Sequence, residues 1–171
     1  YQLNILALSM EKGIEYAPWR ETGLKAGQKL ALLGDDEHVK EFAEFYQLIL
    51  IEKSNIFPDI QNSRKAGFVE SIIPPRSDLV GKTIRQLAIR KTFHIEPVLI
   101  FSQGKAVHGD FSDRELIAGD IIIFHGLWKN INQLKNSGQV IILTSIKGED
   151  GIKTKPLIAL LCFAGGISLA I

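Results

Sequence analysis

The sequence predicts an α+β protein made of two similar units, each with a small mixed or antiparallel sheet flanked by helices, the first unit being cut short. The first observation is a repeat. The stretch "LKAGQKLALLG" (24–34) aligns with "LIAGDIIIFHG" (116–126) at an offset of 92 residues (116 minus 24). The second observation is that short apolar segments bounded by glycine turns alternate with amphipathic segments in both copies.

The strands of the first copy follow from its apolar runs. "NILALS" (4–9) predicts a strand and aligns with "EPVLIF" (96–101) in the second copy. After a turn at Lys12-Gly13 and an Ala-Gly turn, "KLALLG" (29–34) predicts another strand, because glycine permits the positive φ that such turns need. "LIL" (48–50) predicts a last strand.

An amphipathic helix is predicted between the last two strands of the first copy. Asp35 or Asp36 would cap this helix, and negative charge in its first turn favours it. Phe42, Phe45 and Tyr46 would form the bulk of its buried side.

The second copy has an additional upstream part. "FVESIIPP" (68–75) predicts a strand that stops at a double proline. Residues 77–93 then predict a loop and one helix, with Leu79, Ile84, Leu87 and Ala88 on a shared face. The equivalent part of the first copy would precede Tyr1, so the first unit is expected to be truncated. The polar stretch 51–67 predicts a linker.

Composition narrows the classes of function. The chain of 171 residues is 46% hydrophobic and 23% charged, with a net charge of +1. This balance is ordinary for a folded domain and argues against a nucleic-acid partner. The single Cys162 excludes an internal disulfide framework and a four-cysteine zinc site.

The carboxy-terminal stretch 147–171 is predicted to be a connector and the start of a transmembrane helix. Residues 156–171 carry no charge, but a spanning helix needs about 20 apolar residues, so a buried core helix and an apolar strand are the alternatives. The small residues Gly165 and Gly166 and the lysines before the run favour the membrane helix.

One ordered motif carries a family resemblance. "SDLVGKTI" (77–84), a following apolar strand and then Gly119-Asp120 resemble the carboxy-terminal domain of TrkA-type potassium-transport regulators, also called the RCK C-domain. Residues 68–146 carry the whole pattern. Residues 1–50 resemble the second half of another such domain, with Gln28 in place of the usual Asp. The resemblance therefore implies two TrkA-C-like repeats joined by the linker.

Tandem domains of this kind, followed by an apolar helix, resemble the cytoplasmic insert of bacterial sodium-coupled sulfate and dicarboxylate permeases. This implies a regulatory or ligand-sensing module on the cytoplasmic face of the inner membrane, attached to the transmembrane part of the same transporter. The repeats would pair with each other, or with a second chain as a homodimer. A potassium-uptake gating subunit and a purely structural dimerisation module without ligand are the alternatives.

Some RCK C-domains bind cyclic di-AMP, which implies a cyclic dinucleotide or another nucleotide as ligand. Their pocket uses an Arg near the end of the first helix, an Asn-Ile step and a later Pro. Arg90 matches in the second copy, and Asn4, Ile5 and Pro18 match in the first. Glu96 replaces the Asn in the second copy, where a carboxylate would repel phosphate. The structural alternative places Asn4 at a strand start, Ile5 in the core and Arg90 on the surface.

No catalytic motif supports an enzyme. The sequence contains no GxSxG, GxGxxG, Walker loop or HExxH, so no catalytic residue and no bound cofactor are predicted. His108 and Asp110 would share a strand face and give a weak indication of metal binding, with a solvated turn as the stronger alternative. No metal site is predicted.

Overall fold

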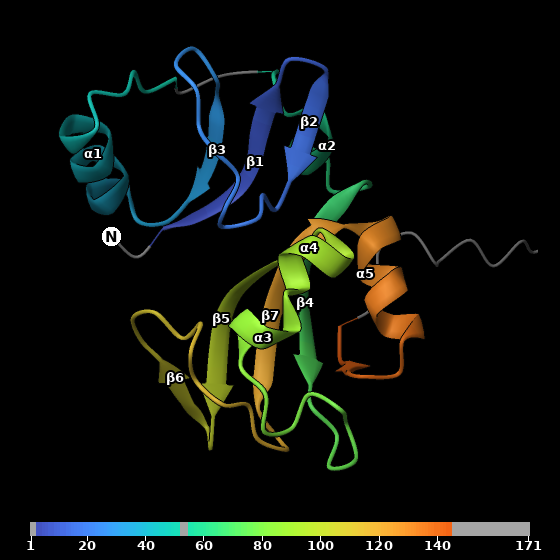
Figure 1. The fold of residues 1–171 in the computed structure, drawn as a ribbon. Helices are drawn as coiled ribbons and strands as arrows, with labels where there is room; N and C mark the ends of the chain where they lie inside the picture. The colour runs from blue at the N-terminus through green and yellow to red at the C-terminus, as the bar shows by residue number, and fades with distance from the viewer. Residues whose placement is uncertain (1–2, 52–54, 145–171) are drawn as a thin grey trace, which may run out of the picture.

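The computed structural model describes residues 3–51 and 55–144, which form two antiparallel sheets and several short helices (Figure 1). This arrangement confirms the α+β class. We call residues 3–51 the first unit and residues 66–144 the second unit. The elements are β1 (Asn4–Met10), β2 (Gly13–Tyr16), β3 (Leu30–Leu33), α1 (Asp36–Phe45), α2 (Pro58–Gln61), β4 (Ala66–Ile72), α3 (Ile84–Leu87), α4 (Ile89–Phe93), β5 (Glu96–Ser102), β6 (Lys105–Val107), β7 (Ile121–Leu127), α5 (Trp128–Asn136) and β8 (Ile141–Ile142).

The strand orders of the two sheets are related. The first sheet has the order β2-β1-β3, and the second has the order β6-β5-β7-β4-β8. Shifted by 92 residues, each Cα pair between β1 and β3 falls on a pair between β5 and β7: Asn4 opposes Leu33, and Glu96 opposes His125. Both pairings also shift register at the same place, at Leu6 and at Val98. The strands β1–β3 therefore repeat the pairing of β5–β7.

The helices α1 and α5 also correspond at this offset, but they are packed differently. Ile131 and Leu134 of α5 are fully buried, whereas only Ala43 is buried in α1. Phe45 is 69% exposed and Tyr46 is 54% exposed, so the prediction that they fill a buried side is wrong. In the second unit α5 packs against β4 and β7, whereas in the part of the chain that the structure describes no strand lies beyond β3 for α1 to cover.

Three other local predictions are corrected. Residues 48–50 form no strand, because the equivalent β8 pairs only with β4 and the first sheet has no such partner. Residues 77–93 do not form one helix but two, since Ala88 adopts a left-handed conformation (φ 47°) between α3 and α4. Asp35 lies at the N-cap of α1, but its side chain makes no capping hydrogen bond.

The predicted linker 51–67 contains regular structure at both its centre and its end. The helix α2 occupies Pro58–Gln61, with proline in the first turn, where its missing N–H is not needed. The strand β4 begins at Ala66, two residues before the predicted boundary. Gly67 is required there, because a Cβ atom would lie 2.3 Å from the Trp128 ring.

The hydrophobic core lies in the second unit, between its sheet and the helices α3, α4 and α5 (Figure 1). Its positions alternate along the strands, as expected for a sheet with one covered face. The core residues are Val69, Ile73, Leu79, Ile84, Ile89, Ile95, Ile100, Leu116, Ile122, Phe124, Ile131, Leu134 and Val140.

Within residues 3–51 and 55–144, no helix is long and apolar enough to cross a membrane. The predicted connector and membrane helix at 147–171 lie outside the described residues.

A candidate ligand-binding cleft between the two units

A cleft of about 870 Å³ lies where the first unit meets the second. The first unit lines it with the start of β1, the segment after β2, and the end of β3 with the following Gly34 and Asp35. The second unit lines it with α3, α4, β5 and the loop after β6. A smaller cavity of about 240 Å³ shares Leu3, Trp19, Arg20 and Arg90 with it. The two cavities therefore adjoin one another, and together they are the candidate site.

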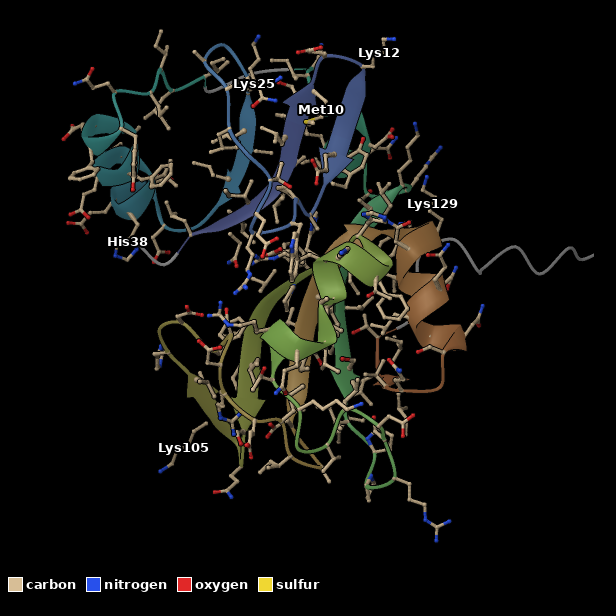
Figure 2. The ribbon with its side chains drawn as sticks, viewed as in Figure 1. Met10, Lys12, Lys25, His38, Lys105 and Lys129 are labelled. Atoms are coloured by element: carbon tan, nitrogen blue, oxygen red, sulfur yellow. The ribbon has the colours of Figure 1, made fainter. Side chains whose placement is uncertain are left out.

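The two units contribute equivalent positions to this cleft. Trp19 and Phe111 are related by the 92-residue offset, and both line it. Figure 2 shows Lys12 and Lys105, which lie at or next to the tips of the two equivalent hairpins, at opposite ends of the molecule. The strands β1 and β5 thus meet near the middle, where they are in contact.

All four residues proposed from the sequence line these cavities. Asn4 lines the larger one, Ile5 and Pro18 line the smaller one, and Arg90 lines both. Asn4 and Ile5 begin β1 and are half-buried, while Pro18 is buried after β2. Arg90 comes from α4 of the other unit. Residues that are far apart in the chain are therefore brought together at one place.

Arg90 is held by Glu96. Its Nε and Nη2 atoms donate to Glu96 Oε2 at 2.5 Å and to Oε1 at 2.6 Å, a bidentate pair. The Glu96 side chain is 1% exposed, and that of Arg90 is 32% exposed. Burial raises the pKa of Glu96 from 4.5 to about 7, and Arg90 offsets this only in part. The Glu96 carboxylate thus accepts the Arg90 hydrogen bonds that an anionic ligand would need.

Two further arginines line the cleft. The Arg20 guanidinium lies 5.6 Å from the centroid of the Trp19 ring, at the distance of a cation–π contact, and its side chain is 42% exposed. Arg85 is paired with the exposed Asp113, to which its Nη2 donates at 2.6 Å. Trp19 and Arg20 were not proposed from the sequence. Both residues directly follow Pro18, and this adjacency is the sequence signal from which they could have been proposed as site residues.

His108 and Asp110 do not share a strand face as expected, because β6 ends at Val107 and both residues lie in the loop that follows. Both line the cleft. Asp110 accepts the backbone N–H of Ser112 at 2.8 Å, and the hydrogen bonds from Ser112 lower the pKa of Asp110. Among the described residues, no group of three or more potential ligands could hold a metal ion.

The lining of the cleft combines the aromatic residues Trp19 and Phe111 with three arginines, each of which is paired with a carboxylate. The family model described as "TrkA-C domain" matches residues 68–137. Residues 68–137 form a TrkA-C domain. This domain supplies Arg90 and the second-unit wall of the cleft.

The sequence is also similar to two curated proteins. It is 31% identical over 83 residues to "Uncharacterized transporter YfbS" of Escherichia coli (strain K12), covering 48% of this chain and 14% of that protein. It is 32% identical over 78 residues to "Uncharacterized transporter sll0640" of Synechocystis sp. (strain ATCC 27184 / PCC 6803 / Kazusa), covering 46% of this chain and 13% of that protein. The chain thus spans about one seventh of the length of these relatives.

Two solved structures of BusR from S. agalactiae resemble part of the fold. One is in complex with busA-promotor DNA, with a TM-score of 0.39, 22% identity, and coverage of 59% of this chain and 47% of that one. The other is in complex with busAB-promotor DNA, with a TM-score of 0.37, 19% identity, and coverage of 58% and 43%.

Proposed function

We propose that this chain is a regulatory, ligand-sensing module of a membrane transporter, on the cytoplasmic face of the inner membrane. The TrkA-C domain and the two relatives named as transporters support a regulatory role associated with transport and favour a non-enzymatic role. Because those relatives are themselves transporters, the proposal places the module within a transporter polypeptide and not in a separate gating subunit. A symporter or permease for an anion or a cation is the class of transporter that we infer.

The proposal takes residues 1–50 as a second, incomplete TrkA-C-like repeat. The matching strand registers and the matching register shifts at Leu6 and Val98 support this. The positive φ of Gly27 (83°) and Gly119 (87°) falls on equivalent positions as well. The backbone N–H of Lys25 donates to Gln28 Oε1, as that of Ile117 does to Asp120 Oδ2. Gln28 therefore accepts the same turn hydrogen bond as Asp120.

We infer that the cleft binds a nucleotide, with a cyclic dinucleotide as the first candidate. One observation carries this: Asn4, Ile5 and Pro18 from one unit and Arg90 from the other line the same pair of cavities. A ligand held by both units would favour one arrangement of them, and that preference would bias the attached transporter.

Isothermal titration calorimetry with cyclic di-AMP, and with AMP and ATP as comparison nucleotides, tests this inference. Arg20→Ala is expected to weaken binding by tenfold or more, whereas Arg76→Ala, a change at an exposed arginine away from the cleft, should leave it unchanged. Glu96→Gln should tighten binding, because it removes the carboxylate that competes for Arg90. If none of these nucleotides gives a binding signal, the nucleotide-sensing proposal is overturned in favour of a structural pairing module.

A further inference from the structure

The Arg90–Glu96 pair joins the cleft to the interior of the second unit. Arg90, on α4, lines both cavities, and its side chain is 32% exposed. The Glu96 side chain, at the start of β5, is 1% exposed. Within the described chain, Arg90 is the hydrogen-bond partner of both Glu96 carboxylate oxygens. A ligand in the cleft can therefore reach the guanidinium, but it cannot reach the carboxylate that holds it.

A ligand anion that accepts the Arg90 hydrogen bonds would leave the Glu96 carboxylate without a partner. An ionised carboxylate that is buried and unpaired is strongly disfavoured, and such a group takes up a proton instead. The proton comes from solvent and turns the carboxylate into a neutral carboxylic acid, while the guanidinium keeps its positive charge. Burial already raises the pKa of Glu96 to about 7, so the carboxylate can take up this proton near neutral pH.

We propose that the cleft binds an anionic ligand together with one proton, which Glu96 takes up as the Arg90 hydrogen bonds pass from its carboxylate to the ligand. This inference rests on the ligand-binding function proposed above and adds the regulation of the same site. Because the proton acts as a second ligand, the affinity for the anion falls as pH rises. The module then responds to the pH of its surroundings as well as to the concentration of the ligand.

Two other titratable groups face the pair from neighbouring elements, and neither supplies this response. His125 lies opposite Glu96 on β7, and burial lowers the pKa of its imidazole, so it is neutral at pH 7 and above. Asp110, in the loop after β6, interacts with Arg90 through its charge. The hydrogen bonds from Ser112 lower the pKa of Asp110, so its carboxylate stays ionised from pH 5.5 to pH 8.

The remaining surroundings of the pair are cationic, uncharged or imidazole groups. Arg85 of α3 and Arg20 of the first unit line the same cleft and stay protonated, because guanidinium groups do not titrate in this range. The start of β1 contributes uncharged side chains, and α5 contributes Asn130, whose Nδ2 donates to the His94 carbonyl oxygen at 3.1 Å. The imidazoles of His94, at the end of α4, and His108, after β6, therefore need a control in any measurement of proton uptake.

Isothermal titration calorimetry of the full chain with cyclic di-AMP tests the coupling, because the phosphodiester groups of this probe keep their charge between pH 5.5 and pH 8. Each pH is measured in two buffers of different ionisation enthalpy, and the difference in heat gives the number of protons taken up. We expect close to one proton per ligand at pH 8 and close to none at pH 5.5. The dissociation constant should be about tenfold larger at pH 8, because only about a tenth of the free protein then carries the proton on Glu96.

Substitutions assign the proton to one group. Glu96→Gln should abolish the uptake at pH 8 and give the same dissociation constant at both pH values. Glu70→Gln, at an exposed carboxylate on β4 outside the cleft, is the matched control and should behave like the native chain. His94→Gln and His108→Gln should each retain the uptake at pH 8. The proton count on the native chain needs no variant, so it tests the proposal whether or not Glu96→Gln folds.

Two results would overturn the coupling and leave the nucleotide-sensing function in place. One is binding of cyclic di-AMP at pH 8 with no proton uptake and with the same dissociation constant as at pH 5.5. The other is loss of the uptake in His94→Gln or His108→Gln, because an imidazole would then be the group that takes up the proton.

If cyclic di-AMP binds at neither pH, the proposed nucleotide function fails, and sulfate then decides the coupling by itself. Sulfate keeps two negative charges over this range. Its addition is followed by the NMR signal of the Arg90 Nε–H group, assigned as the signal that is missing from Arg90→Lys. A shift of this signal at pH 5.5 that is much smaller at pH 8 supports the coupling. Equal shifts at both pH values, or no shift at either, would overturn it.

Discussion

Glu96 makes the stability of this protein depend on pH in a direction opposite to that of most paired carboxylates. It is 1% exposed, and burial raises its pKa from 4.5 to about 7 despite the bidentate contact with Arg90. A raised pKa in the folded state means that folding favours the protonated form. The stability that this form provides is fully present below pH 4.5 and is lost as pH rises through about 7.

The magnitude follows from the size of the pKa difference. One pKa unit corresponds to about 1.4 kcal/mol, so a change from 4.5 to about 7 corresponds to about 3 kcal/mol of unfolding free energy. Glu96→Gln removes the titrating group and keeps an oxygen that can accept one hydrogen bond from Arg90. The unfolding free energy of the native sequence, minus that of Glu96→Gln, should therefore fall by about 3 kcal/mol between pH 4.5 and pH 8.

Urea denaturation at a series of pH values measures this difference. Burial also perturbs His125, which lies opposite Glu96 in the β5–β7 pairing, but it lowers the pKa of the imidazole. The stability that the neutral His125 side chain provides is lost as pH falls, so its effect on the pH dependence of the unfolding free energy is opposite to that of Glu96. Because both proteins contain His125, its effect cancels in the difference. Glu70→Gln, at an exposed position on β4, is the control for the substitution itself. A difference for Glu96→Gln that is flat, or that rises with pH, would refute the reasoning.

Three further predictions concern packing and local structure. In urea denaturation, Ile131→Ala should reduce the unfolding free energy by about 2–5 kcal/mol, because Ile131 is fully buried. Val39→Ala, at the equivalent position of α1, should reduce it by less than about 1 kcal/mol, because Val39 is only half-buried. Equal losses for the two variants would contradict the packing described for α1 and α5. Gly67→Ala should lower the unfolding free energy by about 1–3 kcal/mol and change the tryptophan fluorescence of the protein, because the added Cβ would displace the Trp128 ring. An unchanged emission spectrum would count against this contact. Thr83→Ala should lower the unfolding free energy by about 1 kcal/mol, because Thr83 and Gln86 form a reciprocal capping box at the start of α3. If the variant shows no shift of the thermal midpoint, the capping box contributes nothing to stability.

Much of the candidate site could be predicted from short motifs. Asn4, Ile5, Pro18 and Arg90 were proposed by resemblance alone, and their convergence on one pair of cavities is visible only in three dimensions. The contact between Arg90 and Glu96 could not be predicted, because the sequence suggested repulsion of a ligand at Glu96 but gave no partner for its carboxylate. Trp19 and Arg20 were missed because neither belongs to the motif.

The sequence by itself determined the α+β class and most of the strands, because alternation of apolar residues and glycine turns are local signals. It did not determine which apolar residues are buried. Tyr46 and Leu134 look equally suited to a core, yet one is 54% exposed and the other fully buried. The tertiary structure decided this, since burial depends on whether a strand such as β4 lies beside the helix. Residues 48–50 remain without a strand for the same reason: a strand needs a neighbour to accept its backbone hydrogen bonds.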